Sequence, residues 1–416
     1  MKTVSDVAIV GGGPCGSFTA LELSKSGVKA EVFEEHSEIG VPCHCSGHLS
    51  IKSLKNLGLY PLPEKITENF FYGANFYSPR GTKFSVRFPS PVTCTVNRAS
   101  FDNYIAEMAK AAGVKYHLNS HVESLHIENG FVRGVNVRQN ETEKKLAAKI
   151  VVDAEGTPSR ILRQAGLIPL NRDKLVYAVQ AEVEDVKETE DGILEVFLGK
   201  AYAPGFFAWL IPKRHGRARV GLAAKTGNPK ELLHQLMFKH PKASNQLRRA
   251  RVLRTVFHPI TLGGPIPKTY SHGFLAVGDV ASQVKPTTGG GVILGMTCAK
   301  VAAEVAYEAL QRNGPSSEFL RLYQERCRKI MGFDVNVMRR IRFMLDGISD
   351  EKLDQVFRLC TKLDLAGTLQ KIEEIDFQGR ALLRTLQSPS MLATLAYSFF
   401  LYFSGLHNFL RQKRSV

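Results

Sequence analysis

A short segment near the start of the chain concentrates side chains that can bind metals or carry out redox chemistry. Within GVPCHCSGHLS, residues 40–50, it holds Cys43, His44, Cys45 and His48. Structural zinc sites usually combine two separated ligand pairs, and the chain has no second pair of neighbouring cysteines, so we expect no metal here. A disulfide between Cys43 and Cys45 would close a strained loop across one residue. The segment is therefore either a site of thiol chemistry or a pair of packed thiols.

A glycine-rich turn just before this segment predicts a nucleotide-binding unit. Gly11, Gly13 and Gly16 follow an apolar strand at the G-x-G-x-x-G spacing, and a helix is expected from Pro14 to Ser26. The first glycine allows the turn, the second lets the backbone approach a pyrophosphate, and the third lets the helix pack closely on the strand. The next strand ends at Glu34, whose carboxylate suits a ribose diol and disfavours a 2′-phosphate. FAD or NAD is therefore expected rather than NADP.

Three later stretches each combine an apolar strand, a polar turn and a helix. They are residues 93–117, with Arg98 and Asp102 at the start of the helix; residues 148–166, with a turn at Glu155 and Gly156 and a helix opened by Ser159 and Arg160; and residues 273–310, with a strand ending at Gly278 and Asp279 and a helix opened by Gly289, Gly290 and Gly291.

In motif order and spacing, the chain resembles the FAD-dependent group typified by p-hydroxybenzoate hydroxylase over most of residues 1–310. The resemblance implies FAD as the cofactor, with Asp279 on the ribityl chain and Arg98 along the cofactor. A helix starting at Gly289 would point free amides at the flavin pyrimidine edge, where negative charge accumulates on reduction. The chain departs from the group at Glu155, where an aspartate is usual. The cofactor positions that the resemblance implies are Gly11, Gly13, Pro14, Gly16, Glu34, Glu35, Cys45, Arg98, Val122, Ala154, Gly156, Asp279, Pro286, Gly289, Gly290 and Gly291.

The middle of the chain predicts a second domain built on an antiparallel sheet. Strands with alternating apolar and polar residues run through 166–255, and residues 63–96 look like a further piece of the same domain. The expected fold class is α/β, with a Rossmann-type FAD-binding domain, an antiparallel-sheet substrate domain and a C-terminal helical region. The expected bounds are 1–62, 97–165 and 256–315 for the FAD-binding domain, 63–96 and 166–255 for the substrate domain, and 316–416 for the helical region.

One strand of this second domain carries an aromatic motif, PGFFAWLIP. It resembles the P-x-x-Y-x-W-x-F-P signature of the geranylgeranyl reductase family, enzymes that saturate the double bonds of isoprenoid chains. Pro204, Trp209 and Pro212 match, whereas Phe207 replaces the tyrosine and Ile211 the phenylalanine. Flat side chains suit an apolar tunnel for a polyprenyl tail, although they could equally be core residues of a strand. The substrate-binding residues that we expect are Phe206, Phe207 and Trp209.

The cysteine segment fits the same family. Pro42 and Cys45 match positions at which the family has a proline and, three residues later, a cysteine that faces the isoalloxazine ring. The resemblance therefore implies that Cys45 is the catalytic residue, as a proton donor or as a group that shapes the flavin face. Cys43 is either its redox partner or a neighbour. A small apolar packing role for Cys45 is the alternative.

From residue 316 onward the chain reads as helices. The last of them, Met391 to Leu410, has no charged residue, and Arg411, Lys413 and Arg414 follow it. A narrow polar stripe runs along this helix, which favours a helix lying in a membrane interface over one that crosses the bilayer. A buried helix that covers the substrate tunnel is the alternative. The stripe consists of Thr394, Ser398, Tyr402, Gly405 and Asn408.

Charge and cysteine usage limit the partners and the compartment. The formal net charge of +16 suits an anionic membrane, a phosphate-bearing substrate or nucleic acid, or else marks a solvated basic surface. Seven scattered cysteines and the absence of a secretory signal predict a reduced, cytoplasmic setting, with peripheral membrane association.

Together these features predict a FAD-dependent oxidoreductase that saturates geranylgeranyl chains of archaeal-type membrane glycerolipids or of their polyprenyl precursors. The alternative is a flavin-dependent monooxygenase acting on an aromatic or polyprenyl-quinone substrate, and a third reading is an electron-transfer flavoprotein. The expected partners are an isoprenoid lipid, a membrane surface and an electron donor, but not nucleic acid. Because no second nucleotide-binding fingerprint is found, the donor could be a nicotinamide, a ferredoxin or a deazaflavin.

Overall fold

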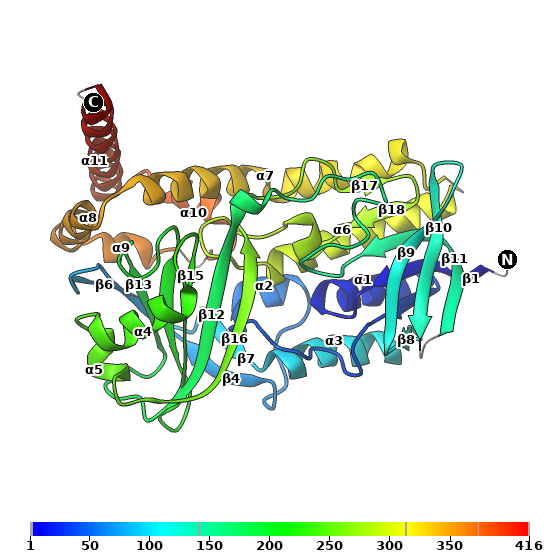
Figure 1. The fold of residues 1–416 in the computed structure, drawn as a ribbon, viewed down its shortest axis with the longest axis horizontal. Coiled ribbons are helices and arrows are strands. Elements are labelled where there is room, and N and C mark those ends of the chain that lie inside the picture. Colours follow the sequence, from blue (N-terminus) through cyan, green and yellow to red (C-terminus); the bar gives the residue numbers. More distant parts are fainter. Residues whose placement is uncertain (1–2, 140–141, 313, 373, 415–416) are drawn as a thin grey trace. The chain divides into compact units, whose positions relative to one another are not determined.

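A computed structural model describes residues 3–139, 142–312, 314–372 and 374–414, with side chains from Ser5 to Tyr402 within those ranges. The chain divides into two units (Figure 1). The first unit comprises residues 1–45, 96–174 and 261–335, and the second comprises 46–95, 175–260 and 336–416. Each unit is therefore assembled from three separate segments of the chain. The expected assignment of functions to domains stays a prediction.

The first unit is built on an eight-stranded sheet. Its path runs β17–β18–β11–β1–β2–β8, and β10 and β9 continue from β11 as an antiparallel ribbon. β1 pairs in parallel with both β11 and β2, as the nucleotide-binding prediction requires. The strands are β1 (Thr3–Val10), β2 (Ala30–Phe33), β8 (Lys115–His117), β9 (Ser120–Glu128), β10 (Phe131–Gln139), β11 (Thr142–Asp153), β17 (Tyr270–Ser271) and β18 (Phe274–Ala276).

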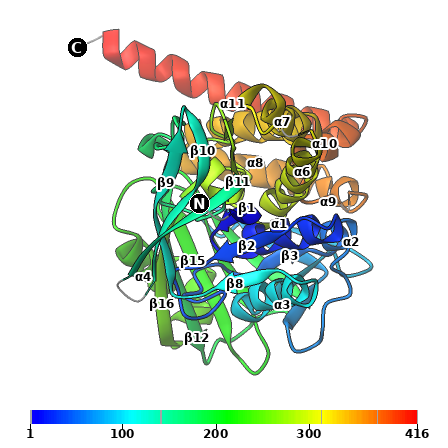
Figure 2. The same ribbon diagram turned by 90° about the vertical axis from the view of Figure 1, so that its right-hand side faces the viewer.

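Three helices of the first unit confirm the sequence prediction. α1 (Pro14–Lys25) lies between α3 (Arg98–Ala111) and α6 (Val292–Gln311) in both views (Figures 1 and 2). Small residues and leucines on α1 are buried there, because they face the sheet and the neighbouring helices. The sheet and these helices therefore form the layered scaffold that positions the glycine turn.

The prediction of a helix that begins at Ser159 and Arg160 is wrong. Residues 159–166 form turns, in which the amide of Gln164 donates to the carbonyl of Ile161 at 3.0 Å. Gly166 has a φ of +76°, a left-handed conformation that ends a helix. The stretch from Ser159 to Gly166 is therefore too short to form a stable helix.

The second unit is built on a seven-stranded sheet in the order β16–β12–β15–β14–β13–β5–β6. Four of its strand pairs, β12–β15, β15–β14, β14–β13 and β5–β6, are antiparallel, as expected, whereas β5 and β13 are parallel. A tight hairpin would force neighbouring strands to be antiparallel. About 120 residues separate these two strands along the chain, so no such hairpin joins them and they can run parallel. The strands are β5 (Gly73–Tyr77), β6 (Lys83–Arg87), β12 (Leu175–Glu184), β13 (Ile193–Leu198), β14 (Phe207–Pro212), β15 (Ala218–Ala224) and β16 (Arg251–Thr261).

One face of this sheet is covered by α4 (Pro229–Lys239) and α5 (Ala243–Leu247). Ala208, Leu210 and Leu222 are buried in that core, together with Leu236 of α4 and Leu247 of α5. Because side chains alternate along a strand, the residues between them on β14 point to the other face. Elsewhere, β3 (His48–Ser50), β7 (Thr93–Val96) and β4 (Thr67–Phe71) form a small sheet, and α2 (Ile51–Asn56) follows β3.

The C-terminal third is helical, as predicted. The helices are α7 (Ser317–Gly347), α8 (Asp350–Lys362), α9 (Leu365–Leu369), α10 (Gln378–Thr385) and α11 (Pro389–Arg414), and short 3₁₀ turns, η1 (Arg172–Lys174) and η2 (Gly278–Ala281), lie earlier in the chain. α11 contacts α8 and α9 within the second unit. Across the described residues, every helix is too short or too polar to pass through a bilayer.

Gly221 on β15 allows the only tryptophan to lie flat on the sheet, and its replacement tests this packing. A Cβ at Gly221 would lie 2.6 Å from Cζ2 of Trp209 and 2.8 Å from the carbonyl oxygen of Val179. We expect Gly221→Ala to lower the free energy of unfolding by about 1–3 kcal/mol, since overpacking must displace the indole or the strand. Denaturant unfolding and the tryptophan emission spectrum measure both effects.

Gly332→Ala, on α7, is the matched control. Its Cβ would meet only the Cβ of Arg328 at 3.7 Å, so the substitution should stabilise the helix by roughly 0.5–1 kcal/mol. An unchanged unfolding midpoint and emission spectrum in Gly221→Ala would contradict the contact.

Candidate functional site

The glycine turn joins β1 to α1 with almost no space for side chains. A Cβ at Gly16 would lie 2.0 Å from the carbonyl oxygen of Gly11, and a Cβ at Gly11 would lie 2.5 Å from that of Ala154. Gly11 also has a φ of +95°, which favours glycine. By contrast, a Cβ at Gly13 would meet no atom within 4 Å. Gly11 and Gly16 therefore hold backbones together, whereas Gly13 borders open space.

Glu34 directly follows β2, lies beside this turn and is buried. Its Oε2 accepts the backbone N–H of Gly12 at 2.7 Å, and its Oε1 accepts the backbone N–H of His36 at 3.0 Å. A carboxylate held by two amides is fixed in place at the carboxyl end of the sheet, where a dinucleotide's ribose binds in this fold. The structure thus brings Glu34 to the glycine turn, as the sequence predicted.

Glu35 and Glu155 have different roles. Glu35 accepts a hydrogen bond from Arg160 at 2.9 Å and contacts His121 at 2.9 Å. Partial burial by itself would raise the pKa of Glu35, but the hydrogen bond and charge of Arg160 lower it. The Glu35 carboxylate is therefore engaged in a surface ion pair with Arg160. Glu155 Oε1 accepts the amides of Arg160 and Ile161 at 2.6 and 3.1 Å. The glutamate that replaces the usual aspartate therefore holds its own turn together.

A buried ion pair opens α3. Arg98 Nε and a terminal nitrogen donate to the two carboxylate oxygens of Asp102 at 3.0 and 2.8 Å, and both side chains are buried. Burial by itself would lower the pKa of Arg98, but Asp102 raises it above that of an ordinary arginine. The thiols of Cys45 and Cys43 act on Arg98 in the same direction, so both lie near the guanidinium. A fixed positive charge therefore stands beside the cysteine segment.

The cysteine segment is anchored on the start of α3. Gly40 has a φ of +82°, and a Cβ there would lie 2.7 Å from Cα of Ala99, so the loop approaches the helix closely. Cys43 and Cys45 are half-buried and belong to no disulfide, and the thiol of Cys43 lies 3.9 Å from the carbonyl oxygen of Cys45. His48 instead bonds Thr93 at 2.7 Å. Among the described side chains, no group of three or more His, Cys, Asp or Glu residues is arranged to hold a metal.

Asp279 and the second glycine cluster lie at the start of α6. The helix begins at Val292, after Gly291, rather than at Gly289 as expected, because Gly289 has a left-handed φ of +70°. A Cβ at Gly291 would lie 2.6 Å from Oδ1 of Asp279, so the carboxylate approaches the backbone ahead of the helix. Burial raises the pKa of Asp279 and Arg98 opposes this shift, which places Asp279 within the field of the arginine.

Sequence reasoning missed Lys285 and Cys15. Lys285 is buried, and its Cε would lie 2.5 Å from a Cβ at Gly290, so its stem lies against the glycine cluster. Cys15 Sγ would lie 2.9 Å from a Cβ at Gly278 and 2.5 Å from one at Gly295, so it packs between these backbones. For Lys285, the signal available in the sequence was a lysine placed directly before the P-T-T-G-G-G loop.

The remaining predicted cofactor positions fall around the same sheet edge or in its core. Ala154 lies against Gly11, Pro14 is the first residue of α1, and Gly156 adopts a φ of +82° with no neighbour near its Cβ position. Val122 is buried in the sheet core, and Pro286 is buried in the loop before α6. Their contacts with a cofactor stay predictions.

The predicted aromatic residues form a cluster within the second unit. The rings of Phe206 and Phe207 stack with centroids 4.3 Å apart, and Phe207 meets Trp209 edge-on at 5.9 Å. Trp209 Nε1 donates to Oε1 of Gln180 at 3.3 Å, on the sheet face that α4 and α5 leave uncovered. The guanidinium of Arg342 lies 4.9 Å from the ring of Phe206. Phe206 is itself buried, whereas Phe207 and Trp209 are half-buried, so these two rings form the accessible apolar surface and Phe206 with Arg342 supports it from behind.

These residues fit FAD. The open space beside Gly13, the fixed carboxylate of Glu34 and the buried Asp279 near Arg98 are what a pyrophosphate, a ribose and a ribityl chain need. When bound, FAD supplies hydride chemistry that the protein's own side chains lack.

Two substitutions in the glycine turn separate cofactor binding from folding. In Gly13→Val the side chain enters the open space, so we expect a folded protein with little bound FAD. In Gly16→Val the side chain would collide with the backbone of Gly11, so we expect loss of stability as well. Flavin absorbance per mole of protein and thermal unfolding give the two readouts. Full flavin content in Gly13→Val would contradict the assignment.

The comparisons with known proteins agree with this geometry. Residues 4–332 match the family described as FAD binding domain. The chain is 33% identical to digeranylgeranylglycerophospholipid reductase 2 of Methanothermobacter thermautotrophicus, covering 94% of this chain and 98% of that protein. It is 32% identical to digeranylgeranylglycerophospholipid reductase of Methanocaldococcus jannaschii, covering 85% and 90%.

A solved structure, the geranylgeranyl bacteriochlorophyll reductase-like protein of Thermoplasma acidophilum, superposes with a TM-score of 0.84 at 25% identity, covering 97% of this chain and 98% of that one. With the glycine turn, the buried acid and the aromatic strand in place, the chain belongs to the FAD-binding geranylgeranyl reductase family.

Proposed function

We propose that this protein is a FAD-dependent reductase that saturates the double bonds of geranylgeranyl chains in archaeal-type glycerophospholipids. The observation that carries the proposal is the match to reductases of such lipids, at 32–33% identity, over nearly the full length of both proteins. The reaction needs a flavin site and an apolar surface for the isoprenoid chain. The glycine turn supports the first, and the aromatic cluster supports the second.

Reduction of an isolated alkene adds a hydride to one carbon and a proton to the other. With FAD bound as the hydride source, the protein's own residues would hold the alkene, exclude water and provide the proton. Phe206, Phe207 and Trp209 are proposed to bind the isoprenoid chain through their flat faces. Because Phe207 has no hydroxyl, this position contributes shape and apolar contact rather than a proton.

The proposal is tested by reducing the bound flavin without oxygen and adding a geranylgeranylated glycerophospholipid. We expect the flavin to reoxidise while the lipid gains two hydrogen atoms per bond, as measured by absorbance and mass spectrometry. If the flavin is discharged only when oxygen is added, and the product carries an oxygen atom, the protein is a monooxygenase and the proposal fails.

Cys45 is proposed as the catalytic residue of this reaction. It is half-buried, and it lies close enough to Arg98 to contribute, after Asp102, to the raised pKa of that guanidinium. A thiol in such a position can donate a proton or shape the flavin face. The neighbouring Cys43, whose thiol points at the backbone of Cys45, is the natural comparison.

Cys45→Ser should keep the protein folded and yellow but remove most alkene reduction, by about 10²- to 10⁴-fold if the thiol is the general acid. Single-turnover reoxidation of the reduced enzyme by lipid measures the step. Cys43→Ser, at a similar exposure two residues away, is the control and should retain activity. If Cys45→Ser retains as much activity as Cys43→Ser, Cys45 has a packing role and not a catalytic one.

Membrane association is proposed to reside in α11. Thr394 and Ser398 of the predicted polar stripe are buried, and their hydroxyls donate to backbone carbonyls four residues earlier at 2.8 Å. The described start of the stripe therefore faces the protein rather than water, contrary to the interfacial arrangement expected from the sequence. The cause is the packing of α11 on α8, where Tyr397 donates to Gln355 and Lys352 donates to the carbonyl of Leu401.

The opposite face of α11 is apolar and exposed. Leu392, Phe399 and Phe400 are 49%, 53% and 66% exposed, at a helical spacing that aligns them. Such a stripe suits insertion into the boundary between lipid headgroups and acyl chains. The side chains of Gly405, Asn408, Arg411, Lys413 and Arg414 lie outside the described residues.

Replacing Leu392, Phe399 and Phe400 together by serine should abolish binding to anionic vesicles. Each side chain contributes about 1.5–3 kcal/mol when buried, so the loss should exceed roughly a hundredfold in partition. Vesicle co-sedimentation measures it. Ile168, Phe238 and Phe257, which are also exposed and apolar, serve as the matched control when changed to serine. Equal loss in the control, or none in either, would place membrane binding elsewhere.

A further inference from the structure

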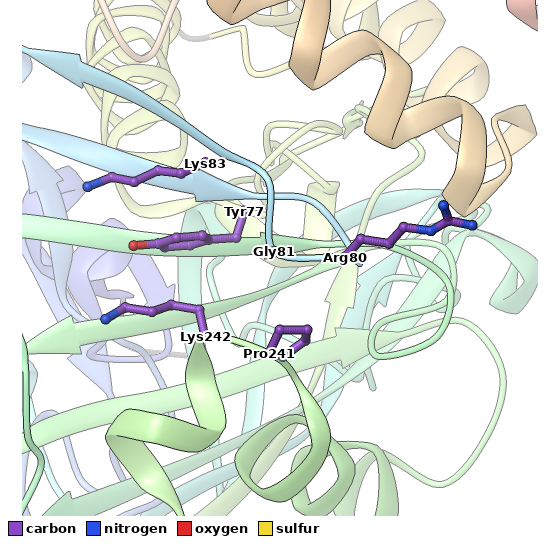
Figure 3. Close-up of a pocket in the computed structure, with 6 residues that line it drawn as sticks. All are labelled: Tyr77, Arg80, Gly81, Lys83, Pro241 and Lys242. Atoms are coloured by element: carbon purple, nitrogen blue, oxygen red, sulfur yellow. The ribbon is translucent and has the colours of Figure 1, made fainter.

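A cavity of about 430 Å³ in the second unit has a cationic lining (Figure 3). Three of its lining residues carry a positive charge and none is acidic. None of the residues assigned above to FAD or to the isoprenoid chain lines it. The lining residues are Tyr77, Arg80, Gly81, Lys83, Pro241 and Lys242.

One wall of the cavity is the hairpin of β5 and β6. Tyr77 and Lys83 are register partners across this antiparallel pair, so their side chains leave the same face of the sheet. The turn between them is closed by the amide of Ser78, which donates to the carbonyl of Thr82 at 3.0 Å. Gly81 adopts the φ of +85° that this turn needs.

The other wall is the segment after α4, and a buried histidine joins the two. His240 lies with Nε2 3.3 Å from the carbonyl of Ser78, and its Nδ1 accepts the amides of Lys242 and Ala243, each at 3.2 Å. Burial lowers the pKa of His240 to about 4, so the ring is neutral at physiological pH and can make both kinds of bond. The walls are therefore held at a fixed spacing.

Hydrogen-bond donors extend from both walls in one direction. Figure 3 shows the side chains of Lys83, Tyr77 and Lys242 running side by side, with their polar ends together. Tyr77 is only 4% exposed, and burial raises its pKa, so its hydroxyl keeps its proton. Arg80 turns the other way in Figure 3 and pairs with the buried Asp354 at 3.3 Å.

Three carboxylates lie near the cavity and limit its positive charge. Glu188 pairs with Lys242 at 3.2 Å but is largely exposed, so an incoming anion can replace it. Glu190 pairs with Arg87 at 2.8 Å. Glu195 is buried, accepts a hydrogen bond from Gln246 at 2.9 Å and lies within the field of Lys242 and Lys83, but burial raises its pKa and so favours its neutral form. Lys83 has no ion pair among the described side chains, so the two lysines carry more positive charge than the exposed Glu188 balances.

We propose that this cavity binds the phosphate group of a phosphorylated small molecule or lipid headgroup. Two ammonium groups can neutralise a dianion, and a phosphate has enough oxygens to accept from both lysines and from Tyr77 together. The volume falls in the range of about 300–1,000 Å³ found for ligand sites, which leaves room for the group that carries the phosphate. The proposal rests on the lining of this cavity and not on the proposed reductase activity.

The test uses the full-length, flavin-loaded protein and calorimetric titration with glycerol phosphate and with inorganic phosphate. We expect Lys83→Gln and Lys242→Gln each to raise the Kd about tenfold, because each removes one charge-assisted hydrogen bond. Tyr77→Phe, which keeps the ring stacked on Phe197, should raise it a few-fold. Lys230→Gln, an exposed lysine of α4 outside the cavity, should leave it unchanged.

Vesicles of phosphatidylcholine with and without phosphatidylglycerol identify the source of the phosphate. If a lipid headgroup is the ligand, the Lys83 and Lys242 variants keep the vesicle binding that α11 provides but lose the preference for vesicles with phosphatidylglycerol over those without it. A soluble ligand leaves that preference unchanged but shows the Kd shifts above. The proposal is overturned if the wild-type protein binds none of these probes, or if Lys230→Gln weakens binding as much as the cavity variants. Phosphate binding and turnover with lipid are separate measurements on the same protein. A failure of this proposal can therefore be told apart from a failure of the proposed reductase activity.

Discussion

The contact between Gly16 and Gly11 is the constraint on which the first unit depends. With room for no side chain between them, α1 can pack against β1, and the same turn brings Gly11 against Ala154 at the end of β11. Two segments that are distant in the sequence thereby meet at one edge of the sheet. The amide of Gly12 then reaches the carboxylate of Glu34. A dinucleotide needs this arrangement because its pyrophosphate must approach the backbone directly, which any Cβ at Gly13 would prevent.

Buried charge is the second element of the flavin unit. Arg98 and Asp102 satisfy each other through two hydrogen bonds, and Asp279 lies within reach of the same positive charge. A buried pair of this kind contributes little net stability, because removing both groups from water is costly. Its value is positional: the guanidinium holds its charge next to the cysteine segment, and Gly40 allows that segment to lie on α3. The chemistry assigned to Cys45 rests on this placement.

The second unit separates apolar and charged surfaces on one sheet. The core beneath α4 and α5 uses one face of the central strands, which leaves Phe207 and Trp209 on the other. At the far end of the sheet, the β5–β6 hairpin supplies a cationic cavity instead. α11 adds a third kind of surface, since Thr394 and Ser398 face inward whereas Phe399 and Phe400 are exposed. The second unit therefore presents apolar and cationic surfaces at separate places on the same sheet.

The sequence by itself determined the flavin unit, the helical C-terminal third and the strands of the second sheet, because glycine spacing, helical periodicity and strand alternation are local signals. It also predicted that Glu34 belongs to the glycine turn. Only the tertiary structure decided that β5 and β13 run parallel, that Thr394 and Ser398 face the protein, and that Glu155 holds its own turn. It alone joined Tyr77, Lys83 and Lys242 into one cavity through His240. These features arise from contacts between residues far apart in the chain, where packing and hydrogen-bond partners, rather than local pattern, set the outcome.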